Sequence, residues 1–357
     1  MKLTLPVILL IFLGSSCQTK TVVSIHEDQF YINGSPTYEG VNWNGYKIEG
    51  LLMNARLVQG IFDDLNPETR GAFKYPDTKE WDPERNTREF VDAMPSWREN
   101  GLLAFTLNLQ GGSPVGYGNT VWVNSTFDPQ GNFRSDYIKR LKLILDKADD
   151  LGMVVILGYF YFGQDQHLED EAAVINAVDN ITRWILENNY QNIIVEINNE
   201  CNIRYDHPIL QPDRVHELID RVKNTEINGH RLLVSTSYGG GTLPKPNVVK
   251  SSDFILLHGN GMHNPAAISK LVESTRRIEG YQIKPILFNE DDHFDFENES
   301  NNMIESIKSY ASWGYFDYRM DGESFENGFQ SVPVDWTISS ERKKSFFKKL
   351  KEVTGDW

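Results

Sequence analysis

The chain has few cysteines and few positive charges for its length. Only 2 of its 357 residues are cysteine, and 35 lysines and arginines are set against 50 aspartates and glutamates, so the net charge is −15. If Cys17 carries lipid, Cys201 has no disulfide partner, and a domain of this size does not need one. An acidic surface argues against nucleic acid as a partner, because nothing would replace the counterions of the phosphates.

Long apolar runs are absent except near the N-terminus. There Lys2, an apolar stretch at Leu5–Leu13 and the small residues 14–16 precede Cys17. The apolar stretch is too short for a permanent membrane helix and is typical of a targeting segment. Small residues before a cysteine resemble a bacterial lipoprotein signal, which implies a cell-envelope protein anchored by lipid on Cys17. A plain secretory signal, which would release the protein, is the alternative.

The sequence also lacks a glycine-rich phosphate loop, internal repeats and a linker. Residues 42–45, at the end of the first predicted strand, do not form such a loop, and this disfavours a doubly wound open sheet. Short apolar runs instead alternate with amphipathic stretches. The predicted strands are 38–43, 103–109, 153–159, 193–197, 232–236, 254–257, 285–288 and 314–318, and the predicted helices are 87–100, 135–151, 171–188, 212–228, 265–278, 300–312 and 339–353. This alternation predicts an α/β fold, a single (β/α)8 TIM barrel over residues 18–357 after a signal segment at 1–17.

Two features are predicted to elaborate the barrel. Val22–Ile25 and Gln29–Ile32 predict an N-terminal β-hairpin that closes the bottom of the barrel. A long loop at residues 44–86, rich in aromatic residues, follows the first predicted strand. Such a loop is expected to wall the mouth of the barrel, and a surface elaboration packed on its side is the alternative.

Two of the predicted strands run into an Asn-Glu pair. Asn199-Glu200 follows the fourth strand and Asn289-Glu290 follows the seventh. Because the C-terminal ends of barrel strands meet at one mouth, we expect the two glutamates to face each other across a pocket. Glycoside hydrolysis needs such a pair, about 5 Å apart when one carboxylate bonds covalently to the sugar.

These motifs resemble clan A retaining glycoside hydrolases, (β/α)8 enzymes that include the family 5 cellulases and mannanases. The resemblance rests on Asn199-Glu200, on Glu290, on the opening Gly40–Trp43 and on His258 at the end of the sixth strand. It implies that Glu200 is the acid/base, that Glu290 is the nucleophile and that Asn199 holds the sugar 2-hydroxyl.

The chain departs from that family at three places. Cys201 stands where the family commonly has proline, and no arginine follows the second strand. The eighth strand ends in Asp317-Tyr318-Arg319, without the usual tryptophan. Cys201 could be a nucleophile, but no histidine is implied beside it, and a small buried residue is the favoured interpretation.

Further residues at strand ends and rims are candidates for binding substrate. His258 and Tyr238 could hydrogen-bond the two carboxylates, and each has a structural role as the equal alternative. The full set of substrate-binding candidates is Asn199, His258, Tyr238, Asn108, Trp43, Asn289 and Arg319, with Trp122 and Trp336 as additional stacking candidates.

Several residues near the predicted strand ends could also form a metal site. Carboxylates and imidazoles that bind divalent ions occur at Asp165, His167, His207, Asp291, Asp292 and His293. Adjacent residues on an extended chain point in opposite directions, however, so we expect no metal and no cofactor.

The sequence therefore predicts a retaining glycoside hydrolase that cleaves β-linked polysaccharide or oligosaccharide, with a membrane contact only through the lipid anchor. A non-catalytic glycan-binding lipoprotein on the same barrel is the first alternative, and a metal-dependent barrel hydrolase is the second. The sugar, the linkage, internal or terminal cleavage and the oligomeric state stay open.

Overall fold

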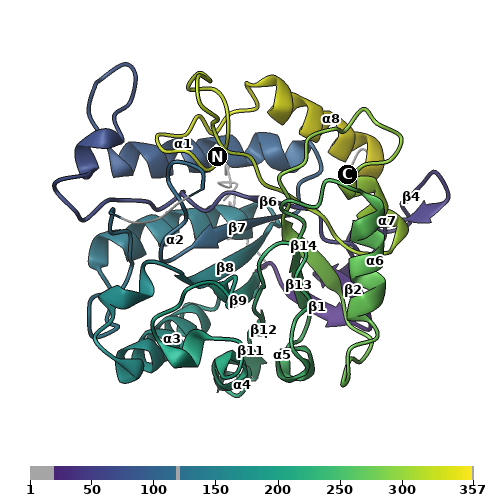
Figure 1. The fold of residues 1–357 in the computed structure, drawn as a ribbon, viewed down its shortest axis with the longest axis horizontal. Coiled ribbons are helices and arrows are strands. Elements are labelled where there is room, and N and C mark those ends of the chain that lie inside the picture. Colours follow the sequence, from purple (N-terminus) through teal and green to yellow (C-terminus); the bar gives the residue numbers. More distant parts are fainter. Residues whose placement is uncertain (1–19, 118–120, 356–357) are drawn as a thin grey trace, which may run out of the picture.

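Parallel strands occupy the centre of the molecule and helices surround them (Figure 1). The structure is a computed structural model that describes residues 20–117 and 121–355. The predicted signal segment and Cys17 lie outside these residues. Within the described chain, no helix combines the length and apolar character that crossing a bilayer requires.

Six of the central strands form one sheet, in the order β12-β9-β8-β7-β6-β15, and two more pair as β13-β14. The strands are β6 (Asn54–Arg56), β7 (Ala104–Asn108), β8 (Val154–Tyr161), β9 (Ile193–Asn199), β12 (Leu233–Ser235), β13 (Ile255–His258), β14 (Ile286–Glu290) and β15 (Gly314–Tyr315). Every residue of β7, β8, β9, β13 and β14 is buried, as expected for parallel strands that are covered on both faces.

The ladders nearly complete a ring. Isolated parallel bridges pair Leu287 with Ser312 and Asp291 with Tyr315, and these bridges connect β14 to β15. Between β12 and β13 no ladder is assigned in the described chain, although the Asp253 amide donates to the Val234 carbonyl at 3.0 Å. The strands predicted after the first are thus present, while a closed hydrogen-bonded barrel is not detected.

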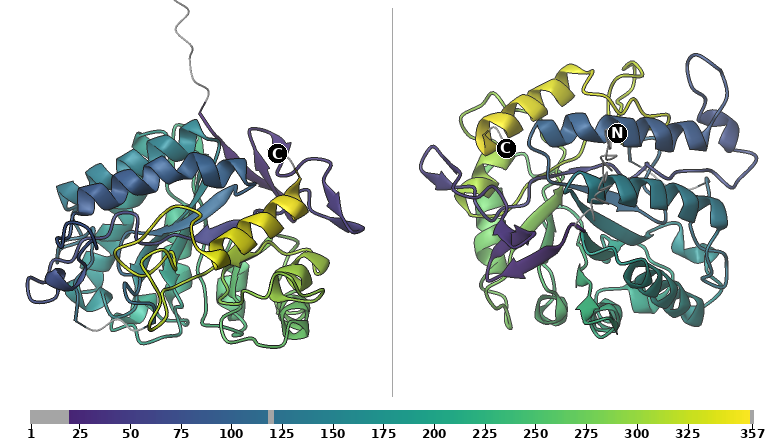
Figure 2. Two further views of the ribbon diagram at one scale, coloured as in Figure 1. Left: turned by 90° about the horizontal axis from the view of Figure 1, so that it is seen from above. Right: turned by 180° about the vertical axis from the view of Figure 1, so that it is seen from behind.

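Eight α-helices are described, and most begin or end where the sequence indicates. They are α1 (Pro83–Glu99), α2 (Ser135–Asp150), α3 (Glu171–Glu187), α4 (Val215–Lys223), α5 (Pro246–Ser251), α6 (Ala266–Thr275), α7 (Asn302–Lys308) and α8 (Glu341–Thr354). Ser340 caps α8 by accepting the Lys343 amide, and Asp82 caps α1 with Pro83 at the first position. Figure 2 shows α1 and α8 as neighbours on one flank.

The N-terminal hairpin is confirmed. β1 (Val23–His26) and β2 (Gln29–Ile32) pair antiparallel, and β3 (Ser35–Pro36) adds to β2. The Phe30 ring lies edge-on to Phe254, which directly precedes β13, with 6.1 Å between centroids. The hairpin therefore covers the N-terminal ends of the strands, opposite the end that carries Glu200 and Glu290.

The first barrel strand was predicted in the wrong place. Asn42–Trp43 (β4) pairs antiparallel with Tyr46–Lys47 (β5) in a small outer hairpin, and β6 at Asn54–Arg56 is the strand that enters the sheet. The segment Leu51–Ala55 is apolar except at Asn54, but the Gly-Val-Asn-Trp stretch resembled a strand more closely. The predicted loop therefore begins after Arg56.

The remaining elements are short. The β-pair is β10 (Glu226–Ile227) with β11 (His230–Arg231), and the 3-10 turns are η1 (Arg70–Ala72), η2 (Asp165–His167) and η3 (Pro208–Leu210). The aromatic residues of the loop after β6 contact each other: Phe62 lies 4.9 Å from Phe73 and 5.6 Å from Trp81 between ring centroids. Phe62 and Phe73 belong to the main hydrophobic core, and Trp81 packs against it, so the loop is packed onto the body of the barrel.

Candidate active site

Glu200 is placed by the turn that ends β9. Its backbone has φ of 53°, in the left-handed region that costs a non-glycine residue about 1 kcal/mol or more. The Glu200 amide donates to Ser237 Oγ at 2.9 Å, and the Cys201 amide donates to the Ser237 carbonyl at 2.9 Å. These two bonds hold the strained turn against the segment after β12. They keep the carboxylate at the strand end, where its side chain is 15% exposed.

Glu290 is the last residue of β14 and is held more completely. Arg56 Nε lies 2.9 Å from its Oε2, and Asn260 Nδ2 donates to its Oε1 at 2.7 Å. The side chain is 6% exposed, and the arginine side chain is fully buried. The carboxylate is therefore held by one hydrogen bond at Oε1 and by an ion pair at Oε2, where Arg56 approaches without the geometry of a hydrogen bond.

His258 lies between the two carboxylates at the end of β13. Its Nδ1 is 3.0 Å from Glu200 Oε1 and 3.7 Å from Glu290 Oε2. A β-bulge between Leu257 and His258 shifts the register so that His258 pairs with Glu290. One oxygen of each glutamate and a nitrogen of His258 all lie within 4.8 Å of one another. The structure thus brings together three of the residues predicted at this end of the strands.

The three groups shift one another's pKa values. Burial raises the pKa of Glu290, and the charges of Arg56 and His258 offset this only in part. Burial also acts on Glu200, but the hydrogen bond and charge of His258 bring the pKa of Glu200 below its ordinary value. For His258, burial opposes the cation, yet the negative charges of Glu290 and Glu200 raise its pKa. The arrangement therefore favours a proton on the imidazole that faces Glu200.

Arg56 was missed as a site residue because its strand was missed. Arg56 falls inside the long loop predicted at residues 44–86, whereas the family resemblance pointed to an arginine after the second strand. In the structure Arg56 ends β6, the neighbour of β7 and β15, and points at Glu290. The sequence does contain a signal for Arg56, because an arginine that directly follows an apolar run places a charge at the end of a strand.

A second group that sequence reasoning missed covers Glu290 from outside. Tyr117 donates its hydroxyl to Asp292 Oδ2 at 2.8 Å and accepts from Asn260 Nδ2 at 2.9 Å. The Gly261 amide donates to Asp292 Oδ1 at 3.2 Å. These residues come from three different loops, so no local sequence pattern could link them.

Three predicted asparagines lie under or beside the pair. Asn289 Nδ2 donates to the buried Glu196 Oε2 at 3.2 Å. Asn108 ends β7, and a Cβ on Gly158 would lie 2.3 Å from its Oδ1, so this glycine makes room for the amide. Asn199 is buried, and its Oδ1 has no hydrogen-bond partner. These amides form a polar layer at the strand ends, with acceptors left for a ligand or water.

Three other predicted substrate residues are not brought to this place. Trp43 lies on the β4–β5 hairpin, where its Nε1 contacts Glu352 of α8 at 3.3 Å. Arg319 Nη2 donates to the carbonyls of Ser331 at 3.2 Å and Pro333 at 2.6 Å, so it ties a loop together.

Tyr238 is the third. It is buried, and its hydroxyl accepts the Lys245 amide at 3.2 Å rather than bonding a glutamate. These positions were predicted from closeness to strand ends along the chain, which does not determine where a side chain points.

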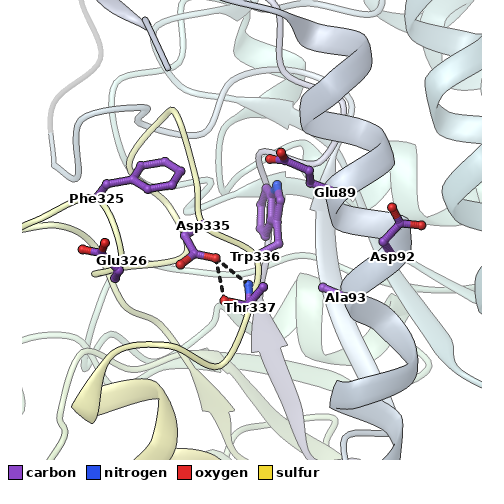
Figure 3. Close-up of a pocket in the computed structure, with 8 residues that line it drawn as sticks. All are labelled: Glu89, Asp92, Ala93, Phe325, Glu326, Asp335, Trp336 and Thr337. Carbon is purple, nitrogen blue, oxygen red and sulfur yellow. Dashed lines mark hydrogen bonds between the residues drawn. The ribbon is translucent and has the colours of Figure 1, made fainter. Parts of the chain in front are cut away.

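The two additional tryptophans are core residues. Trp122 is buried, with its ring 6.4 Å edge-on from Phe73. Trp336 Nε1 donates to Asn86 Oδ1 at 3.1 Å, and its ring forms one wall of a cavity of about 380 Å³ on the flank between α1 and residues 325–337 (Figure 3). The cavity is lined by Glu89, Asp92, Ala93, Phe325, Glu326, Asp335, Trp336 and Thr337.

The metal candidates have structural partners. Asp291 Oδ2 accepts from Trp313 Nε1 at 2.9 Å and from Asn302 Nδ2 at 3.0 Å, and its Oδ1 lies 2.6 Å from His293 Nδ1. One atom each of Asp291, Asp292 and His293 falls within 4.8 Å, closer than an extended chain suggested. The donors around Asp291 nevertheless occupy the lone pairs that a metal would need.

Two other metal candidates, Asp165 and His207, also have hydrogen-bond partners within the protein. Asp165 Oδ2 accepts the amides of Asp206 at 2.8 Å and His207 at 3.2 Å. His207 Nε2 lies 3.1 Å from the Asp165 carbonyl oxygen and 3.2 Å from that of Leu168. These contacts join the turn after β8 to the turn after β9.

Cys201 is a buried free thiol. Its side chain is 1% exposed, and burial raises its pKa to about 12. A thiol with this pKa is almost entirely protonated at neutral pH, so it is not a nucleophile.

Comparisons with known proteins agree with the fold. No family model and no curated protein matches the sequence. Among solved structures, a glycoside hydrolase family 5 protein from Bacteroides vulgatus ATCC 8482 is 15% identical over 94% of this chain and 71% of that chain, with a TM-score of 0.57.

Two further structures match most of their own length. A family 5 glycoside hydrolase from Prevotella bryantii B14 is 12% identical over 85% of this chain and 95% of that chain, with a TM-score of 0.54. A family 5 mannosidase from Rhizomucor miehei is 12% identical over 93% of this chain and 97% of that chain, with a TM-score of 0.52. At these identities the likeness shows the fold alone: the neighbours imply a (β/α)8 barrel of the kind used by glycosidases.

Proposed function

We propose that this protein is a retaining glycoside hydrolase that cleaves β-linked polysaccharide or oligosaccharide. The observation that carries the proposal is the approach of a Glu200 oxygen to within 4.8 Å of a Glu290 oxygen at the strand ends. Retaining enzymes hold their carboxyl groups about 5–5.5 Å apart, whereas inverting enzymes leave about 6.5–9.5 Å for a water molecule. The observed approach fits the retaining arrangement.

Glu290 is assigned as the nucleophile. Its carboxylate accepts a hydrogen bond from Asn260 Nδ2 at 2.7 Å and forms an ion pair with Arg56, whose Nε lies 2.9 Å from Oε2. A nucleophile held in one orientation loses little entropy when it attacks the anomeric carbon. The strand position of Glu290 and its low exposure support this role over that of a solvated acid.

Glu200 is assigned as the acid/base. The leaving oxygen needs a proton, and the hydrogen bond of 3.0 Å between His258 Nδ1 and Glu200 Oε1 already contains one when the imidazole is charged. Transfer along this bond leaves a neutral imidazole and a protonated Glu200. Once Glu290 has bonded to the sugar its negative charge is gone, and Glu200 can accept a proton from the attacking water.

The directions of the pKa shifts of Glu290 and Glu200 indicate where the shared proton lies before a sugar binds. Burial makes Glu290 the more easily protonated carboxylate, whereas the hydrogen bond from His258 favours the Glu200 anion. Because one proton is shared among interacting groups, a bound sugar that contacts Glu200 is proposed to draw it there. Asn199 is proposed to hold the 2-hydroxyl, and its free Oδ1 supports that role.

The same three groups are also a candidate metal set, which is the basis of a second function. Glu200, Glu290 and His258 offer ligand atoms within 4.8 Å of one another. The guanidinium of Arg56 at 2.9 Å from Glu290 opposes it, because a buried positive charge repels a divalent cation. Metal analysis of the purified protein, with turnover measured before and after chelation, separates a metal-dependent hydrolase from the proposed one.

The first experiment is a panel of β-linked glucans, mannans and xylans with product sizing. The wild-type protein is expected to shorten at least one of them, and Glu290→Gln, which keeps size and fold, is expected to remove the activity. Binding of a glycan without shortening, in wild type and variant alike, would instead support a non-catalytic glycan-binding protein. Equal activity of the variant and the wild type would end the assignment of Glu290.

Location at the cell envelope is a proposal from the sequence of residues 1–17. Lipid on Cys17 would place the barrel on a membrane surface without a membrane-crossing helix. Labelling with radioactive palmitate in a bacterial host, with Cys17→Ala as the control, is expected to mark only the unchanged protein.

A further inference from the structure

The contacts around Glu290 are distributed unevenly around the ring of strands. Arg56 ends β6, Tyr117 follows β7, Asn260 follows β13 and Asp292 follows β14. With Phe316, which follows β15, these residues come from β13, β14, β15, β6 and β7, which are consecutive neighbours around the ring. A continuous arc of five strands therefore contributes to the cover of Glu290.

Tyr117 is the residue that connects this arc across the mouth. Its hydroxyl bridges Asn260 at 2.9 Å and Asp292 at 2.8 Å. Its ring lies edge-on to Phe316 and Tyr318, with centroids 5.7 Å and 5.1 Å apart.

The other side of Phe316 faces Arg56, whose guanidinium carbon is 5.9 Å from the ring centroid. The tyrosine thus contacts both partners of Glu290: Asn260 by a hydrogen bond, and the ion-paired Arg56 through the ring of Phe316.

The segment that carries Tyr117 is itself fixed to the segment after β15. The Val332 amide donates to the Pro114 carbonyl at 2.7 Å, and Gln330 Nε2 donates to the Gly116 carbonyl at 3.1 Å. Gly116 has φ of 103°, and a Cβ there would lie 2.7 Å from Tyr318 Cδ2, so the backbone passes this ring as only glycine allows. The tyrosine is held from several directions although its surface is 53% exposed.

The arc that carries Glu200 is different. The segments after β9 and β12 expose Asn202, Arg204 and residues 240–243. The three consecutive glycines at 239–241 form part of this rim, and Gly240 comes so close to the Asn260 carbonyl oxygen that a Cβ would lie 2.2 Å away. The segments on the Glu200 side thus present glycines and exposed side chains, whereas Tyr117 and its partners lie on the Glu290 side.

From this asymmetry we infer that Tyr117 closes one end of the cleft, so that the enzyme removes single sugars from the non-reducing ends of chains. The inference rests on the proposed function. The sugar that bonds to Glu290 lies on the closed side, where Tyr117 leaves no path for a second unit beyond it. The leaving chain, protonated by Glu200, departs over the open side. Tyr117 is a specificity-determining residue for chain position.

The test uses cellohexaose, mannohexaose and xylohexaose, each labelled at the reducing end with a fluorescent amine, and follows the first labelled products. Wild-type protein is expected to give the labelled pentasaccharide first. Tyr117→Ala, which opens the closed end, is expected to raise the ratio of labelled di-, tri- and tetrasaccharide to pentasaccharide by about tenfold or more, a typical size for loss of a steric discriminator.

Two variants control this result. Tyr117→Phe keeps the ring and loses the bridging hydroxyl, so it is expected to keep terminal cleavage. Tyr46→Ala removes another exposed tyrosine, on the distant β4–β5 hairpin, and is expected to leave the products unchanged. Internal cleavage by the wild type, or an unaltered product pattern in a folded Tyr117→Ala, would overturn this inference and leave the hydrolase intact. No hydrolysis of any hexasaccharide by the wild type would overturn the proposed function and the inference with it.

Discussion

The two glutamates follow the same Asn-Glu motif but occupy different surroundings. Glu290 is 6% exposed and is held by an ion pair with Arg56 and a hydrogen bond from Asn260. Glu200 is 15% exposed, stands on a left-handed turn and receives its side-chain hydrogen bond from His258. One carboxylate is immobilised under a cover and the other stays reachable beside a proton donor.

This difference teaches that the surroundings, rather than the motif, distinguish the roles proposed for the two glutamates. A nucleophile gains from fixed geometry, and an acid/base gains from access to the leaving group and to water. The predictions below test whether the two carboxylates differ in function as they differ in environment.

The largest expected effect is a difference in how the two glutamates respond to the leaving group. Glu290→Gln is expected to lose about 10⁴-fold or more of kcat on both a 2,4-dinitrophenyl glycoside and a natural glycan, because no bond to the sugar can form. Glu200→Gln is expected to lose the same on the natural glycan but to keep a rapid first step with dinitrophenolate, which leaves without a proton. Initial-burst kinetics on the two substrates provide the measurement. Equal losses in both variants on both substrates would remove the distinction between the residues.

A smaller loss is expected when the buried cation beside Glu290 is removed. Arg56→Met deletes a charge-assisted contact of 2.9 Å, and we expect about 10²–10³ less kcat. The variant also leaves a buried carboxylate without its partner, at a cost of about 3–5 kcal/mol in the free energy of unfolding.

Arg140→Met is the matched control, since Arg140 is equally buried but pairs with Glu84, at 2.9 Å, away from the site. It should lower stability and leave kcat near wild type. A loss of kcat of equal size in both variants, measured where both are folded, would mean that Arg56 acts only through stability.

The pH profile is expected to show His258 as the holder of the proton. Its raised pKa means that the proton is bound below the ordinary histidine value of about 6.5 and is lost as the pH rises through the higher folded value. The basic limb of kcat/KM is therefore expected above pH 6.5, and the stabilising contribution of the charged imidazole is expected to disappear over the same range.

In His258→Gln the basic limb is expected to move to lower pH, because a carboxyl group alone then holds the proton. Rate profiles and thermal unfolding from pH 4 to 9 measure both effects. A basic limb that stays in place in this variant would show that His258 does not supply the proton.

The smallest effect is expected at Cys201, next to Glu200. With its pKa raised to about 12 by burial, the thiol is expected to resist a disulfide reagent at pH 8 until the protein unfolds. Cys201→Ala should keep turnover near wild type. Rapid labelling of the folded protein together with loss of activity would restore Cys201 as a nucleophile candidate.

The parts of the fold that could be predicted from the sequence are those that follow from local patterns of apolar residues. β8 and β9 are unbroken buried runs, and α2 and α3 have a clear apolar face, so their positions agree with the prediction to within two residues. β6 has only three residues, and a longer strand-like stretch precedes it. Its true place depends on pairing with β7 and β15, which no local pattern states.

The residues of the candidate site also fall into two groups, those that local sequence patterns predict and those that only tertiary packing brings together. Glu200, Glu290 and His258 are chemistry-bearing residues at strand ends, and their convergence follows from the expected parallel ring. Asn260 and Tyr117 lie in loops of irregular conformation, and their contacts with Glu290 and Asp292 span 30 and 175 positions of sequence. Such contacts result from tertiary packing and could be seen only in the folded chain.

The most direct test of the central claim is to trap the sugar on the protein. Incubation with an activated 2-deoxy-2-fluoro glycoside of the sugar found in the glycan panel, followed by proteolysis and mass spectrometry, is predicted to place the label on Glu290. Label on Glu200, or turnover of the glycan to an inverted anomer with no label on either residue, would contradict the account.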